Sequence, residues 1–310
     1  MSESPYQILL FYLYCPIEDP IAWRDAHREL GARLDMKGRV IVAKEGINGT
    51  ASGTPEACAE YMAAIKSDPL TADTWFKVDP VDEHQFPKMS VKARDEIVSL
   101  HLGDDDFSPL ETTGKYLDPP QWREALADPD TVVIDARNKY EWELGRFENA
   151  VLPPVDSFRE LPEWIRDNRE KFEGKKILTY CTGGIRCEKF SGFLVREGFE
   201  DVSQLHGGIW AYANDEEVRG DKFEGSCYVF DGRISMPVNH TDSAKSVSVC
   251  SVTGKASERY VNCRNKRCNR KFFLSEEGES QFGKFCCEPC KQRVLELEKT
   301  LFEEAEREPV

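Results

Sequence analysis

The stretch that decides the fold is residues 180–187, YCTGGIRC, which lies between an apolar run and a helical pattern. Residues 176–180 (KILTY) predict a buried strand, and a helix is predicted from about Arg186 to Glu197. Cys181 therefore stands at the mouth of a glycine-rich loop that leads to a helix N-terminus. Backbone N–H groups and the helix dipole favour negative charge there, so we predict a nucleophilic thiolate with a lowered pKa.

The loop has the composition of an anion cradle. Glycine has no Cβ to block inward-facing N–H groups, and an arginine adds a permanent positive charge. The predicted catalytic residues are Cys181 and Arg186, and the predicted cradle comprises Thr182, Gly183, Gly184 and Ile185. The alternative is a buried cysteine before an ordinary turn. Cys187 is either a resolving thiol for an oxidised Cys181 or a helix residue packed against the sheet.

The segments around the loop alternate between strand and helix patterns. Strands are predicted at residues 131–135, 176–180 and 202–204, with helices at about 117–127 and 186–197. This alternation indicates an α/β domain with a mainly parallel sheet, spanning residues 114–222.

Further motifs make this domain resemble the rhodanese family. They are Asp135-Ala136-Arg137, Glu141-Trp142, residues 145–150 (GRFENA) and residues 205–209 (LHGGI). The resemblance implies that Asp135 and Arg137 help to fix the domain around the loop and that Cys181 carries a persulfide sulfur. Six residues run from Cys181 to Arg186, as in sulfur-transferring rhodaneses. Relatives that hydrolyse phosphate esters carry one residue more, so a phosphatase is the weaker enzyme interpretation.

The first 100 residues show a different order of elements. Strands are predicted at residues 7–14, 39–43, 48–52, 75–78 and 96–100, and helices at 20–34 and 55–66. The order β-α-β-β-α-β predicts a ferredoxin-like α+β domain over residues 1–100, a fold that says little about function. Residues 101–113 are rich in Asp, Ser and Thr and are interpreted as a linker.

Four segments together resemble a narrower family, the bacterial tRNA uridine hydroxylases. They are residues 42–50 (VAKEGINGT), 92–98 (KARDEIV), 181–188 (CTGGIRCE) and 225–233 (GSCYVFDGR). The resemblance implies oxygen-dependent conversion of wobble uridine to 5-hydroxyuridine, with Cys181 essential. Molecular oxygen would be the co-substrate and the tRNA anticodon region the partner. The sequence contains no flavin, haem or nucleotide-binding signature.

Charge is distributed unevenly along the chain. The formal net charge of −15 weighs against nonspecific RNA binding, but residues 255–271 hold seven basic residues and one acidic residue. This segment predicts a phosphate-contacting patch, which Lys44, Lys88, Lys92 and Arg94 of the first domain would extend. The predicted RNA-binding residues are Lys44, Arg94, Arg264, Lys266, Arg267 and Arg270. The alternative is a solvated basic loop that balances the acidic C-terminal helix.

Six of the eleven cysteines fall within residues 250–290. Two short-spaced pairs favour one tetrahedral ion, and four sulfurs favour zinc. We therefore predict that residues 223–310 form a cysteine-rich, zinc-binding region with a terminal helix. The predicted ligands are Cys263, Cys268, Cys287 and Cys290, with Cys286 competing with Cys287.

The N-terminus lacks the basic and apolar regions of a secretory signal, and no apolar run approaches ~18 residues. A cytoplasmic location is therefore expected, where cysteines serve catalysis or metal binding before disulfides. No membrane association is predicted, and no protein partner is identifiable. Three functions remain: a tRNA uridine hydroxylase, a rhodanese-type sulfurtransferase with a persulfide on Cys181, and a non-catalytic binding module, which the intact Cys181 and Arg186 disfavour.

Overall fold

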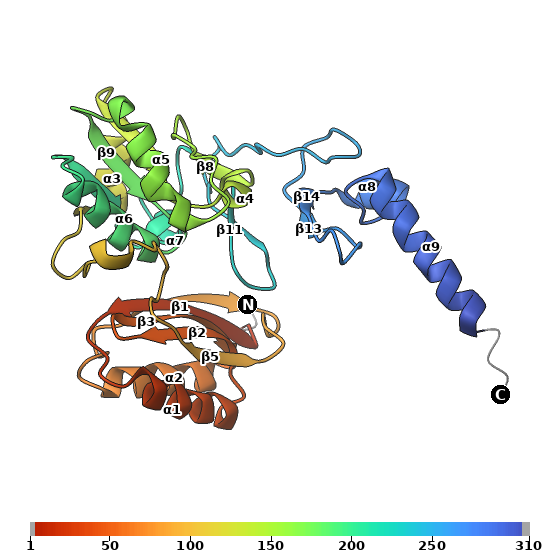
Figure 1. Ribbon diagram of the computed structural model, residues 1–310, viewed down its shortest axis with the longest axis horizontal. Coiled ribbons are helices and arrows are strands. Elements are labelled where there is room, and N and C mark those ends of the chain that lie inside the picture. Colours follow the sequence, from red (N-terminus) through yellow and green to blue (C-terminus); the bar gives the residue numbers. More distant parts are fainter. Residues whose placement is uncertain (1–3, 306–310) are drawn as a thin grey trace.

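The computed structural model describes residues 4–305, which form three parts in chain order (Figure 1). The first part is a five-stranded sheet with two helices covering one face (Figure 1). Its elements are β1 (Tyr6–Tyr14), α1 (Pro20–Arg33), β2 (Lys37–Ala43), β3 (Gly46–Gly53), α2 (Pro55–Ser67), β4 (Trp75–Val81) and β5 (Met89–Ala93). The strand order is β4-β1-β3-β2-β5, and only β2 and β5 pair in parallel.

Side-chain alternation gives this sheet two different faces. Successive residues of a strand point to opposite sides, so Val40 and Val42 enter the core beneath α1 and α2. Leu10, Tyr12 and Arg39 lie on the other face, which turns toward the central domain. The helices thus leave one face of the sheet available to the functional site.

The central part is an α/β domain built on a four-stranded parallel sheet of order β6-β10-β9-β7. The strands of this sheet are β6 (Lys115–Leu117), β7 (Thr131–Asp135), β9 (Lys176–Tyr180) and β10 (Val202–Leu205), and a short strand outside it is β8 (Gly145–Phe147). Its helices are α3 (Pro119–Ala125), α4 (Lys139–Trp142), α5 (Leu161–Asp167), α6 (Ile185–Arg196) and α7 (Gly208–Asn214). Three 3₁₀ turns are η1 (Gly103–Asp105), η2 (Phe158–Glu160) and η3 (Arg169–Lys171). The predicted mixed α/β architecture with a mainly parallel sheet is confirmed.

The C-terminal part begins with a strand that pairs with the central domain. β11 (Phe223–Tyr228) lies between β8 and β12 (Ser235–Pro237), antiparallel to both. A two-stranded ribbon, β13 (Tyr260–Asn262) and β14 (Lys271–Phe273), then leads to α8 (Glu276–Phe282) and α9 (Glu288–Ala305). α9 projects away from the other two parts (Figure 1). Among residues 4–305, no helix is both long and apolar enough to cross a membrane.

The strand predicted at residues 96–100 is wrong, because the fifth strand is β5 and residues 96–100 are irregular. Side chains bind the backbone of this segment instead of a neighbouring strand. The N–H of Ile97 donates to Glu45 at 2.6 Å, and its carbonyl accepts from Asn48 at 3.0 Å. Residues 222–249 contain two further strands, β11 and β12.

Candidate active site

Cys181 follows the last residue of β9, at the floor of a loop that leads into α6. The N–H of Gly184 donates to its Sγ at 3.1 Å, and the residue is fully buried. The first turn of α7 holds the loop, because the N–H groups of Ile209 and Trp210 donate to the carbonyls of Cys181 and Thr182, each at 3.0 Å. The loop is therefore fixed from both sides around the sulfur.

Gly184 is required at its position in this loop. Its φ of +107° lies in a region that residues with a Cβ rarely adopt. A Cβ here would also lie 2.7 Å from the hydroxyl oxygen of Tyr12 on β1. The glycine thus allows close contact between the loop and the first domain, besides exposing its N–H to the sulfur.

The surroundings of Cys181 favour its thiolate. Burial by itself disfavours the charged form, but the Cys187 thiol, the Arg186 charge and the N–H groups of Cys187 and Gly184 together lower the pKa of Cys181 to about 5. Burial and the neighbouring Cys181 sulfur raise the pKa of Cys187 well above its ordinary value. The two thiols therefore differ in state: Cys181 is ionised at neutral pH, and Cys187 is a protonated donor.

Arg186 forms a buried bidentate ion pair with Glu141. Its two terminal nitrogens donate to the carboxylate at 2.5 and 2.8 Å, and one also contacts Thr182 Oγ1 at 3.3 Å. Burial disfavours the charged carboxylate, but the Arg186 charge outweighs it and the pKa of Glu141 is lowered. Glu141 was not among the predicted site residues, although the Glu-aromatic motif pointed to it.

Asp135 and Arg137 make a second buried pair, behind the loop. Arg137 donates to Asp135 at 2.9 and 2.7 Å and to the Gly145 carbonyl at 2.7 Å, and both side chains are fully buried. The Tyr180 hydroxyl donates to Asp135 at 2.6 Å. Because Tyr180 directly precedes Cys181, this network fixes the end of β9 from which the sulfur is presented.

A cavity of about 420 Å³ opens in front of Cys181. Its walls come from the loop, from the uncovered face of the first sheet and from the segment after β11. The residues that line it include Leu10, Tyr12, Arg39, Ile41, Asn48, Asn138, Phe158, Arg159, Cys181, Arg186 and Phe230. The site is thus shared by all three parts of the chain. Residues of the first domain could not be assigned to it from local sequence patterns.

Lys189 of α6 ties the first and central domains together. Its side chain is fully buried, and its ammonium lies 2.9 Å from Glu45, 3.6 Å from Glu96 and 3.1 Å from Asp106. On the same helix, Glu188 accepts from the Tyr12 hydroxyl at 2.9 Å. These contacts hold the uncovered sheet face against the cysteine loop.

Lys77 of β4 is a further charged group in this interface. It is 1% exposed, and its ammonium lies 4.1 Å from the ring centre of Trp75 and 5.2 Å from that of Tyr12. No hydrogen-bond partner of its nitrogen is found in residues 4–305. Burial lowers the pKa of Lys77 to about 8, against the opposing effect of the Cys181 charge.

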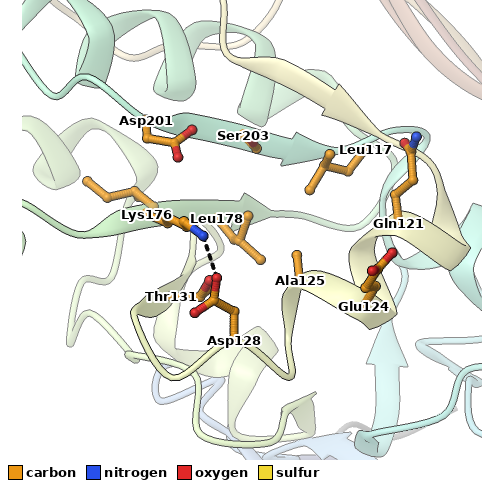
Figure 2. A pocket seen from close by; sticks show the side chains of 11 residues that line it. Leu117, Gln121, Glu124, Ala125, Asp128, Thr131, Lys176, Leu178, Asp201 and Ser203 are labelled. Carbon is orange, nitrogen blue, oxygen red and sulfur yellow. Dashed lines mark hydrogen bonds and ion pairs between the residues drawn. The ribbon is translucent and has the colours of Figure 1, made fainter.

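A larger cavity of about 520 Å³ lies at the opposite end of the central sheet (Figure 2). Lys176, the first residue of β9, reaches Asp128 across it, with Asp201 and Ser203 nearby (Figure 2). Cys181 follows the last residue of the same strand, so this cavity lies away from the thiolate. Its lining is partly polar and contains no cysteine, so it does not share the chemistry of the Cys181 site.

Four cysteines of the C-terminal part form a compact group that could hold a metal ion. The sulfurs of Cys263, Cys268, Cys286 and Cys290 all lie within 4.8 Å of one another. The structure places Cys286, and not the predicted Cys287, in this group. Cys287 directly precedes α9, where its carbonyl accepts from the Cys290 N–H at 3.1 Å, and its side chain is exposed. Its sulfur lies 3.8 Å from that of Cys286.

The six predicted RNA-binding residues are all exposed. Arg264, Lys266, Arg267 and Arg270 lie between β13 and β14, whereas Lys44 and Arg94 follow β2 and β5. Arg264 is paired with Glu298 at 2.5 Å. None of the six is among the described residues that line the Cys181 cavity. Their role in RNA binding stays a prediction.

The low pKa of Cys181 predicts an unusual pH dependence of alkylation. Only the thiolate reacts, so its reaction with iodoacetamide should rise with a midpoint near pH 5 and be level by pH 7. Cys15, whose pKa burial raises to about 11, serves as the internal control and should remain nearly unreactive at pH 7. Peptide mass spectrometry measures both rates; a Cys181 midpoint near 9 would contradict the assignment.

Three family profiles match the chain in order. They are the UPF0176 acylphosphatase like domain at residues 6–97, the rhodanese-like domain at residues 118–215 and the rhodanase C-terminal domain at residues 224–291. The fold and the cysteine loop thus define a rhodanese-domain protein.

Close relatives narrow this class. The chain is 54% identical over 290 residues to proteins named tRNA uridine(34) hydroxylase from Bacillus mycoides (strain KBAB4) and Bacillus cereus (strain B4264). Each match covers 94% of this chain and 90% of the relative. The chain belongs to the tRNA uridine(34) hydroxylase family, as the sequence motifs predicted. Among solved structures, a rhodanese-like domain from Anabaena sp. matches with 21% identity and a TM-score of 0.30, covering 42% of this chain and 89% of that one.

Proposed function

We propose that this protein hydroxylates uridine 34, the wobble nucleoside of the tRNA anticodon, to 5-hydroxyuridine in the cytoplasm. Molecular oxygen is the proposed co-substrate. The observation that carries the proposal is the ionised Cys181 at the floor of a cavity built by all three parts of the chain. The family relationship extends over 94% of the chain.

The chain's own groups have distinct roles in this proposal. Cys181 is the essential thiolate, and the Gly184 N–H stabilises its charge. Arg186 adds positive charge at the sulfur, while Glu141 fixes its orientation. Asp135 and Arg137 act through Tyr180 and hold the strand end from which Cys181 projects. Asp135 and Arg137 are therefore positioning residues.

The experiment that tests this function is analysis of tRNA nucleosides from cells lacking the gene. We expect 5-hydroxyuridine and nucleosides derived from it to disappear from position 34. In a reaction of purified protein with ¹⁸O₂, the new hydroxyl group should carry the label. Unchanged 5-hydroxyuridine derivatives would refute the proposal. Loss of a thiolated nucleoside instead would support a sulfurtransferase that carries a persulfide on Cys181, the alternative favoured by the six-residue loop.

We further propose that the cysteine group of the C-terminal part holds a structural zinc ion. Four sulfurs within 4.8 Å of one another match the tetrahedral thiolate sites that zinc prefers. The apolar cluster around them is small, so a metal would contribute much of the local folding free energy.

This zinc site predicts different behaviour of two adjacent cysteines. Purified protein should contain about one zinc per chain by elemental analysis. The Cys286→Ser variant should lose most of that zinc and the cooperative unfolding of residues 250–300. Cys287→Ser, one residue away and exposed, is the matched control and should keep both. Metal content well below one per chain in the parent protein would reject the site.

A further inference from the structure

Two arginines from different parts of the chain stand at the Cys181 cavity. Arg39 lies on β2 of the first domain, and Arg159 lies in η2 of the central domain. Both side chains are exposed, and neither has a carboxylate within 4.0 Å among the described residues. The other lining arginine, Arg186, is ion-paired with Glu141. Arg39 and Arg159 are therefore the cavity's uncompensated positive charges.

The fold dictates where these two guanidinium groups lie. On β2, Val40 and Val42 are buried in the core, so the alternate residues Arg39 and Ile41 line the cavity. In η2, Phe158 enters the core of the central domain and anchors Arg159 beside it. Each of the two arginines thus directly adjoins a buried residue, which fixes the position of its backbone at the cavity.

Phe230 is an exposed aromatic side chain on the same cavity. It follows β11, is 43% exposed and lines the cavity together with Arg186, whose guanidinium lies 5.7 Å from the ring centre. Its ring also packs edge-on against Tyr228, with centroids 5.2 Å apart. An aromatic side chain that is both held and exposed is suited to stacking on a nucleobase.

The cavity has the size and lining of a site for one nucleotide. Its volume of about 420 Å³ falls in the range of small-ligand sites, roughly 300–1,000 Å³. Its lining combines apolar Leu10, Ile41 and Val98 with polar Asn48 and Ser157. Because Cys181 is at the floor and fully buried, a base reaches it only when it is unstacked from its neighbours.

From these observations we infer that the cavity binds a single nucleotide turned out of an RNA loop, with its base on Phe230 and its flanking phosphates on Arg39 and Arg159. Guanidinium groups bind phosphate oxygens in a bidentate manner, and unpaired loop bases are free to splay outward. The inference rests on the proposed tRNA function and deepens it. It assigns the contacts around the target base to residues outside the basic segment 255–271.

Binding of a fluorescent anticodon stem-loop, measured against salt concentration, tests this inference. Arg39→Ala and Arg159→Ala should each weaken binding about five- to tenfold at low salt and reduce the salt slope by about one. Arg33→Ala removes the same charge from α1, on the opposite side of the sheet, and should change neither quantity. Unchanged affinity and slope in both cavity variants would overturn the inference.

A second experiment tests the contact between the nucleotide base and Phe230. Phe230→Ala should weaken binding about tenfold with no change in salt slope, because stacking releases no counterions. With a stem-loop that lacks the base at position 34, wild type and Phe230→Ala should bind equally. An equal loss with both RNAs would refute stacking of that base. All variants should retain the parent unfolding transition, since the replaced side chains are exposed.

The failures of the two proposals are distinguishable. If hydroxylation is confirmed while Arg39, Arg159 and Phe230 variants bind normally, the nucleotide-site inference fails and the function stands. If the stem-loop protects Cys181 from iodoacetamide in a base-34-dependent way but no hydroxylated product forms, the site stands and the function fails.

Discussion

The Cys181→Ser variant should lose tRNA hydroxylation, with a rate below about one thousandth of the parent rate. The cavity surroundings lower the pKa of Cys181 to about 5, so the parent residue is a thiolate at neutral pH. A serine hydroxyl stays protonated there and cannot form a persulfide. The measurement is mass spectrometry of 5-hydroxyuridine in tRNA treated with equal amounts of each protein.

Serine is close to cysteine in size, so the loss of hydroxylation expected for Cys181→Ser should not result from unfolding. The Cys15→Ser variant is the matched control, because Cys15 is also buried but lies outside the cavity, and burial raises the pKa of its thiol to about 11. The Cys15→Ser variant should retain the parent hydroxylation rate. Hydroxylation by Cys181→Ser at a rate near the parent value would remove the central role of this sulfur.

The largest effect on stability is expected from Asp135→Asn. This change preserves shape but removes the charge that balances Arg137, in a place where both side chains are fully buried. Leaving a buried ion without its partner costs about 3–5 kcal/mol, so the free energy of unfolding of the central domain should fall by that amount. Urea unfolding followed by tryptophan fluorescence measures it.

The control for this variant is a surface pair in the same domain. Asp128 pairs with Lys176 at the groove at the opposite end of the central sheet, where water screens both charges (Figure 2). Asp128→Asn should change the free energy of unfolding by less than about 1 kcal/mol. Equal effects of the two substitutions would contradict the structural role of the Asp135–Arg137 pair.

The parts of the site that were predictable come from residues close together in the chain. Cys181, Gly184 and Arg186 share one strand–loop–helix unit, so their convergence follows from local geometry. The same holds for Asp135 and Arg137, which are two residues apart and bond directly. The rhodanese-type domain could therefore be assigned from motifs alone, and the chain's relatives confirm it.

Other features depended on contacts between distant segments. The apolar run at residues 96–100 looks like a strand, but Glu45 and Asn48 bind its backbone from about 50 residues away. Whether Cys286 or Cys287 joins the cysteine group depends on where α9 begins, because Cys287 is oriented by that helix start. Local sequence patterns therefore predict neither the irregular backbone of residues 96–100 nor the choice of Cys286 over Cys287.

The sequence by itself thus determined the cysteine loop and the domain that presents it, because short-range backbone geometry governs both. Only the tertiary structure decided what surrounds the sulfur. Tyr12 reaches Glu188 across 176 residues of chain, and this packing brings the uncovered sheet face, with Arg39, to the cysteine loop. Burial and pairing then distinguish the arginines: Arg186 forms an ion pair with Glu141, whereas Arg39 and Arg159 have no carboxylate within 4.0 Å among residues 4–305. Such pairing is a property of three-dimensional proximity, which residue spacing along the chain does not encode.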